Sequence, residues 1–163
     1  MTHTLVRYQT IRPGKRPLVL QQHLSYAVNL LIDTDMATDH AAILILDDVD
    51  VVRSRILDML KDLEVEFLEA NSAPSAAQAI QQYQPKVAIL DIQVPGDGSL
   101  KNGMDVLRWA HVNHPKTAVI MITNFDLPQY RKVCTALGAV HFFDKSHEFD
   151  RLHDAVKELI ENR

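Results

Sequence analysis

Short, uninterrupted apolar segments recur along most of the chain and alternate with amphipathic stretches of helical period. Three of these segments, Ala42–Leu46, Val87–Leu90 and Ala118–Ile122, are apolar at every position. A strand with one buried face would alternate apolar and polar residues, so a continuously apolar strand indicates a sheet covered on both sides. Two less regular segments, Glu64–Glu69 and Val140–Phe143, complete a set of five predicted strands.

The stretches that follow these strands place apolar residues three and four positions apart, which is the spacing of one buried helix face. In the first of them, Val52, Ile56 and Leu60 follow this spacing. Gly138 comes directly after the fourth stretch and is a natural helix stop. The five predicted helices cover residues 51–62, 75–83, 104–112, 127–137 and 149–160.

Strict alternation of strand and helix predicts right-handed crossovers and a parallel sheet. At this length we expect an α/β fold, a flavodoxin-like doubly wound (βα)5 domain with a five-stranded parallel sheet in the order 2-1-3-4-5. Residues 41–163 are assigned to this domain. Residues 1–40 fit the pattern poorly and are interpreted as an N-terminal extension, partly helical over residues 18–32 or flexible.

Composition and charge exclude several classes of protein. The chain is 47% hydrophobic and 23% charged, as expected of a folded globular domain, and its net charge of −4 argues against direct binding of nucleic acid. No segment approaches the roughly 20 apolar residues that span a bilayer, and a secretory signal is missing from the first residues, so we expect no membrane association. A lone cysteine, Cys134, suits a reducing compartment, and we expect a cytoplasmic protein.

Polar residues stand where the predicted strands end. Asp47 and Asp48 follow the first strand, Asp91 the third, Thr123 the fourth and Lys145 the fifth. In a doubly wound sheet the ligand site lies outside the carboxyl ends of the strands, so these side chains should meet there. The second strand lies at an edge in the expected order and would contribute nothing.

Three carboxylates at one rim repel one another unless a cation is present, and oxygen ligands of this kind suit Mg²⁺. We expect Mg²⁺ to be bound by Asp47, Asp48, Asp91 and the backbone carbonyl of Gln93. An Asp carboxylate can attack phosphorus and form an acyl phosphate, which makes Asp91 the candidate nucleophile. The metal, the ammonium group of Lys145 and a threonine hydroxyl after the fourth strand would meet the charge on the phosphoryl oxygens.

This combination resembles the receiver domain of bacterial two-component response regulators, a family that includes chemotaxis regulators, over about residues 41–161. In that family an acidic pair ends the first strand, the phosphorylated Asp ends the third, a Thr or Ser the fourth and a Lys the fifth. An Arg stands five residues beyond the acidic pair, and a Gly opens the third helix. The matching residues here are Leu46-Asp47-Asp48, Arg53, Leu90–Pro95, Gly103, Met121-Ile122-Thr123 and Phe142–Lys145.

The resemblance implies a single-domain receiver that accepts a phosphoryl group on Asp91 from a sensor histidine kinase or a histidine phosphotransfer protein. It implies that Thr123 and Phe142 act as switch residues, the aromatic ring turning inward as the threonine moves toward the phosphoryl group. With no effector domain after Arg163, output is expected through phosphorylation-dependent binding of an unidentified protein. Apart from self-catalysed phosphotransfer and autodephosphorylation, no enzymatic activity is expected. A homodimer through the face of the fourth helix, fifth strand and fifth helix is left open.

Several positions depart from the family pattern. The loop Gly96–Asn102 is several residues longer than usual, and Asn124 replaces a small residue; both could change phosphoryl lifetime or partner choice. Ser146 replaces the usual proline after Lys145, so we expect a trans peptide bond there. Phe142 lacks the hydroxyl of the tyrosine that is frequent at this position.

Alternative functions remain. A pseudo-receiver would act as a constitutive protein-interaction module without phosphorylation. A magnesium-dependent aspartyl phosphatase would normally need a second Asp two residues after Asp91, where Gln93 stands. A nucleotide- or flavin-binding domain is disfavoured because the turn after the first strand is not glycine-rich. Residues 1–35 precede Met36, an alternative start, and we expect their deletion to leave melting temperature and phosphorylation unchanged.

Overall fold

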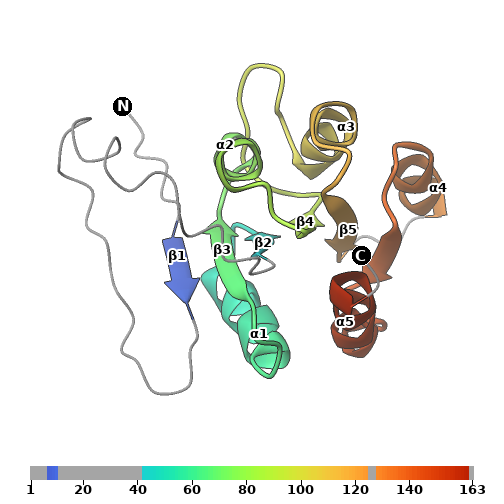
Figure 1. Cartoon of the computed structure of the whole chain (residues 1–163). Coiled ribbons are helices and arrows are strands. Elements are labelled where there is room, and N and C mark those ends of the chain that lie inside the picture. Colours follow the sequence, from blue (N-terminus) through green and yellow to red (C-terminus); the bar gives the residue numbers. More distant parts are fainter. Residues whose placement is uncertain (1–6, 11–41, 125–127, 162–163) are drawn as a thin grey trace, which may run out of the picture.

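A six-stranded sheet organises this computed structural model, which describes residues 7–10, 42–124 and 128–161 (Figure 1). The elements, in chain order, are β1 (Arg7–Thr10), β2 (Ala42–Leu46), α1 (Asp50–Leu60), β3 (Glu66–Ala70), α2 (Ala73–Tyr83), β4 (Val87–Asp91), α3 (Gly103–Asn113), β5 (Ala118–Thr123), α4 (Pro128–Ala136), β6 (His141–Asp144), a 3₁₀ turn (Phe149–Arg151) and α5 (Leu152–Glu161).

The strand order is β1-β3-β2-β4-β5-β6, and the five strands from β2 to β6 pair in parallel. Without β1, this is the predicted order 2-1-3-4-5, so the flavodoxin-like doubly wound fold is confirmed. Every residue of β4 and β5 is buried, as the continuous apolar segments predicted. The sheet is thus enclosed on both faces.

Two apolar cores lie on opposite faces of the sheet. One joins the sheet to α2, α3 and the buried Cys134 of α4, and the other joins it to α1 and α5. Figure 1 shows the same division, with α1 and α5 below the strands and α2 and α3 above them. Side chains alternate between the faces along each strand, so neighbouring strand residues such as Leu44 and Ile45 belong to different cores.

Local signals account for where several helices begin and end. Ser72 and Ser75 form a capping box at the start of α2, and Gln84 ends that helix in the left-handed conformation. Helix α4 ends at Ala136, and Gly138 follows with a φ of +102°, as expected of the predicted stop. In the described part of the chain, no helix combines the length and apolar character that a bilayer crossing requires.

Strand β1 was not predicted. It pairs antiparallel with β3 from Arg7 opposite Glu69 to Thr10 opposite Glu66, and so becomes the edge of the sheet. The sequence Arg-Tyr-Gln-Thr carries no apolar run, so the strand depends on its neighbour rather than on its own pattern. The helix expected over residues 18–32 and the start of the fourth helix at residue 127 lie outside the described residues.

Candidate functional site

The register of the parallel strands brings the predicted polar residues to one edge of the sheet. Leu46 pairs with Leu90, so the next residues, Asp47 and Asp91, end neighbouring strands. In the same way Asp91 is aligned with Ile122 on β5, and Thr123 with Asp144 on β6. Because each of these residues is at or one step from a strand end, the central carboxylates, Thr123 and Lys145 meet outside the carboxyl ends of four strands.

Lys145 joins the two inner carboxylates. Its Nζ lies 2.6 Å from Oδ2 of Asp47 and 2.8 Å from Oδ2 of Asp91. All three side chains are buried, with Asp47 fully enclosed. Buried charges need partners, and one ammonium group between two carboxylates leaves a net negative charge at the site. The site therefore favours a further cation.

The carboxyl group of Asp91 is only partly satisfied. Burial raises its pKa above the ordinary value, and the neighbouring charge of Asp47 acts in the same direction, while the hydrogen bond from Lys145 opposes both. Its Oδ1 is buried and has no hydrogen-bond partner among the described residues. A buried acceptor without a partner is costly, so this oxygen is the atom on which a ligand would have most effect.

Asp47, Asp48 and Asp91 form a set of oxygen donors suited to a hard divalent cation. One carboxylate oxygen from each lies within 4.8 Å of the others, and Asp48 is exposed where the inner two are buried. Mg²⁺ prefers a few carboxylates and retains several waters, and the single unpaired oxygen of Asp91 fits such a shell. When bound, the ion would neutralise charge on phosphoryl oxygens. That the Gln93 carbonyl binds the metal stays a prediction. The Gln93 backbone does lie near Asp91, because its hydrogen bond lowers the pKa of the Asp91 carboxyl.

A buried ion pair lies behind Asp47. The Nε of Arg53 donates to Oε2 of Glu69 at 3.0 Å, and its NH1 donates to the backbone carbonyl of Asp47 at 2.7 Å. A third guanidinium nitrogen contacts Asp50. The guanidinium thus fixes the backbone that carries Asp47. Arg53 was recognised from the sequence, but Glu69 was not, although a carboxylate between the apolar residues Leu68 and Ala70 was a visible signal.

Thr123 and Phe142 both lie beneath the surface. Thr123 is fully buried, and its carbonyl accepts from the backbone amide of Lys145 at 2.9 Å. Phe142 is 4% exposed and packs in the same core as α2, α3 and Cys134. Their predicted switching role remains a prediction, since one arrangement of the two side chains is described.

The two departures in loop structure have clear local geometry. No described peptide bond is cis, so the bond from Lys145 to Ser146 is trans, as expected. The long loop forms a tight turn in which Asp97 and Leu100 exchange backbone hydrogen bonds of 3.0 and 2.8 Å. Pro95 also accepts from the amide of Ala73 at 2.8 Å, which attaches the start of the loop to α2. Asn124 is exposed beside the end of β5.

A doubly wound α/β domain with an acidic cluster and a lysine at the carboxyl edge of its sheet has the architecture of the receiver class of signalling domains. The family model for the response regulator receiver domain matches residues 43–157. This chain therefore belongs to the response regulator receiver family of two-component systems, and the resemblance of its sequence is confirmed.

Curated relatives fall into two groups by length. Over 121 residues the chain is 29% identical to Protein CcdB of Bacillus subtilis, covering 72% of this chain and 96% of that protein. It is 25% identical to sporulation initiation phosphotransferase F of the same organism, covering 72% and 92%. By contrast, the chain spans about half the length of other relatives, for example 53% of the response regulator GacA of Pseudomonas viridiflava, with 25% identity and 71% of this chain covered.

Solved structures give the same fold. The signal receiver domain of a putative Luxo repressor protein from Vibrio parahaemolyticus superposes with a TM-score of 0.68 at 25% identity, covering 76% of this chain and 92% of that one. A CheY-like receiver domain protein from Methanospirillum hungatei superposes with a TM-score of 0.67 at 23% identity, covering 76% and 95%.

Proposed function

We propose that this chain is a receiver that accepts a phosphoryl group on Asp91 and signals by binding a protein when phosphorylated. The observation that carries this proposal is the buried carboxylate of Asp91, whose Oδ2 contacts Lys145 at 2.8 Å while Oδ1 has no partner among the described residues. One oxygen is oriented and the other is available. A carboxylate in this state is suited to attack phosphorus.

Different residues around that oxygen have different roles in the proposed transfer. Asp47 and Asp48, with the backbone carbonyl of Gln93, complete the ligand set for Mg²⁺. Lys145 orients Asp91 and supplies positive charge to a phosphoryl oxygen, and the Thr123 hydroxyl supplies a donor from the next strand. The new bond joins a carboxylate oxygen of Asp91 to phosphorus, and the bond from phosphorus to the donor breaks. The donor is a phosphohistidine of a sensor kinase or phosphotransfer protein.

Output follows from movement of Thr123 and Phe142 when the phosphoryl group is present. Binding a ligand only to one state shifts the equilibrium toward that state, and a change from 1:99 to 99:1 needs roughly 5.5 kcal/mol. The downstream partner is a protein, and a cytoplasmic location belongs to the same proposal. Autodephosphorylation is the only further reaction proposed.

A pseudo-receiver is the second candidate. It is favoured by Asn124, which is exposed beside the end of β5 where the family usually has a small residue. A side chain of this size there could restrict phosphoryl transfer. The presence of every charged residue that the reaction needs favours the first proposal.

The test is phosphorylation by acetyl phosphate in the presence of Mg²⁺, followed by intact mass. We expect the wild-type protein to gain one phosphoryl mass and Asp91→Asn to gain none. Asp97→Asn, which changes an exposed aspartate in the adjoining loop, is the matched control and should react like wild type. No gain in wild type, with beryllofluoride also failing to bind, would favour the pseudo-receiver.

A further inference from the structure

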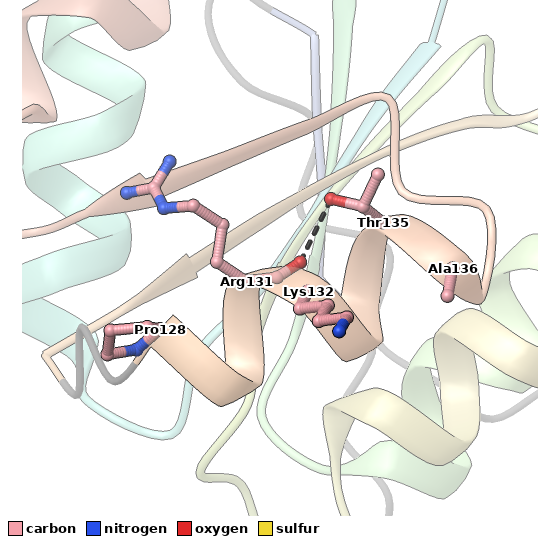
Figure 2. Close-up of a pocket in the computed structure, with 5 residues that line it drawn as sticks. All are labelled: Pro128, Arg131, Lys132, Thr135 and Ala136. Atoms are coloured by element: carbon pink, nitrogen blue, oxygen red, sulfur yellow. Dashed lines mark hydrogen bonds between the residues drawn. The ribbon is translucent and has the colours of Figure 1, made fainter.

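Arg131 lies on α4, on the side of that helix that faces β6. Together with Pro128, Lys132, Thr135 and Ala136 it borders a shallow surface groove. Figure 2 shows these side chains on α4, with the guanidinium group of Arg131 extended away from the helix. The hydroxyl of Thr135 donates to the Arg131 carbonyl at 2.9 Å, so this backbone carbonyl also accepts a side-chain hydrogen bond.

The guanidinium group contacts residues beyond its own helix. NH1 donates to the backbone carbonyl of Phe142 at 2.7 Å, and the guanidinium carbon lies 4.8 Å from the centre of the Phe142 ring. NH2 donates to Oε2 of Glu148 at 2.6 Å. Arg131 therefore contacts both the strand residue three before Lys145 and the carboxylate three after it.

Glu148 is hydrogen-bonded to the backbone of Asp144 and so stabilises the turn that carries Lys145. Its Oε2 accepts from the backbone amide of Asp144 at 3.1 Å, and its own amide donates to the Asp144 carbonyl at 2.8 Å. The hydrogen bond from Arg131 holds the pKa of Glu148 below its ordinary value, which means that this contact favours the ionised carboxylate.

The Asp144 side chain completes the turn. Its Oδ1 accepts from the amide of Ser146 at 2.9 Å, and its Oδ2 contacts His147. Asp144 is 5% exposed, so its carboxylate is buried, whereas the His147 side chain that contacts it is exposed. Ser146 stands where a proline is usual in the family, and here side-chain hydrogen bonds fix the backbone on both sides of Lys145.

We propose that Arg131 is a positioning residue that couples α4 to Lys145 through Glu148 and Phe142. This inference rests on the proposed role of Asp91 as phosphoryl acceptor. When Lys145 and Thr123 meet a phosphoryl group, the turn and the Phe142 carbonyl shift, and Arg131 transmits that shift to α4. Coupling between two sites is reciprocal, so a protein seated on the α4 groove would also change the affinity of the acidic site for a phosphoryl group.

The test compares hydrogen exchange of the α4 amides before and after loading with Mg²⁺ and beryllofluoride, a phosphoryl mimic. Arg131→Gln removes the coupling, and Glu148→Gln is a second variant in case the first does not fold. Arg151→Gln is the matched control, because Arg151 donates to the other oxygen of the same Glu148 at 2.7 Å and belongs to the following turn rather than to α4. Fluorine NMR reports loading independently of exchange, and thermal melting reports folding.

In wild type we expect loading to change α4 exchange by at least about fivefold. Arg131→Gln should still load, with most of the α4 response lost, and Arg151→Gln should respond like wild type. Folded Arg131→Gln that loads and keeps the full α4 response would overturn the coupling alone, as would an equal loss in Arg151→Gln. Failure of wild type to load would overturn the proposed function, and this inference with it.

Discussion

Gly103 lies directly against the carbonyl oxygen of Asp91. A Cβ built at Gly103 would stand 1.8 Å from that oxygen, and the Gly103 amide donates to the Ile92 carbonyl at 3.0 Å. The loop of residues 93–102 therefore begins and ends beside the proposed phosphoryl acceptor. A side chain at residue 103 would displace the end of β4, because the atoms it meets belong to the backbone.

Gly103→Ala is expected to lower the free energy of unfolding by about 2 kcal/mol or more, since overpacking of this kind usually costs 1–3 kcal/mol. It should also slow phosphorylation by acetyl phosphate. Gly98→Asn is the control in the same loop, because Gly98 has a φ of +49° and open space around its Cβ direction. Urea unfolding of both variants checks the prediction, and equal stability of the two would contradict it.

Mg²⁺ is expected to raise the melting temperature of wild type, because it binds the folded acidic cluster and not the unfolded chain. At a Mg²⁺ concentration one hundred times Kd, binding would add about 2.7 kcal/mol to the free energy of unfolding. Asp48→Asn should lose most of this rise. Without metal, the same variant should be at least as stable as wild type, since one of three like charges is removed. Asp58→Asn, an exposed aspartate of α1, should behave like wild type. Thermal melting with and without Mg²⁺ is the measurement.

Glu69→Ala is expected to lower the free energy of unfolding by about 3 kcal/mol, because it removes the buried carboxylate partner of the Arg53 guanidinium and leaves only the exposed carboxylate of Asp50. Glu69→Gln retains a hydrogen-bond acceptor of similar shape and should cost less. Because Arg53 also donates to the Asp47 carbonyl, the alanine variant should weaken Mg²⁺ binding as well. Chemical unfolding and magnesium titration measure the two effects, and a cost below about 1 kcal/mol would show that the pair is well solvated.

His153 should make stability depend on pH. Hydrogen bonds to Asp154 and to Asp62 raise the pKa of His153 above its ordinary value of 6.5. A group whose pKa is raised by folding contributes stability that is complete below the unfolded pKa and is lost as pH rises through the folded pKa. His153→Gln should therefore lower the melting temperature near about pH 5.5 and have little effect near about pH 8.5. Asp62→Asn should weaken the same pH dependence; a melting profile in His153→Gln that follows wild type would refute the assignment.

Deletion of residues 1–35 removes β1, so a fall in melting temperature is now expected, in contrast to the neutral outcome expected from sequence. Phosphorylation should be unaffected, because β3 and β2 separate β1 from the strand that carries Asp91. Deletion of residues 1–6 leaves β1 in place and serves as the control. An unchanged melting temperature after the longer deletion would show that the β1–β3 pairing contributes little.

Much of the fold and the acidic cluster could be predicted because the signals were local. Continuous apolar segments identified β2, β4 and β5, and a parallel sheet necessarily brings the residues after such strands together. That geometry alone predicts that Asp47, Asp48 and Asp91 lie together, and their carboxylate oxygens do so in the structure.

Contacts between distant residues could not be predicted in the same way. Strand β1 lacks an apolar pattern and exists only through its pairing with β3. The partner of Arg53, and the bonds that join Arg131 to Phe142 and Glu148, depend on how α1 and α4 are placed against the sheet. Apolar spacing identifies the buried face of a helix, but it does not specify which distant side chains that face will meet. The sequence showed only that Ser146 replaced a proline, not what would stabilise the turn instead.

The hydrogen bond from Arg131 to the Phe142 carbonyl also affects whether a strand of another chain can pair with the edge of the sheet. Among the described strands, β6 lies at one edge of the sheet, and the free side of an edge strand is a template on which another chain can add by backbone pairing. Both outer strands, β1 and β6, are four residues long, and on β6 the guanidinium group occupies a carbonyl that an incoming strand would need. Loss of Arg131 would therefore expose a docking edge for aggregation at high concentration, a liability separate from signalling.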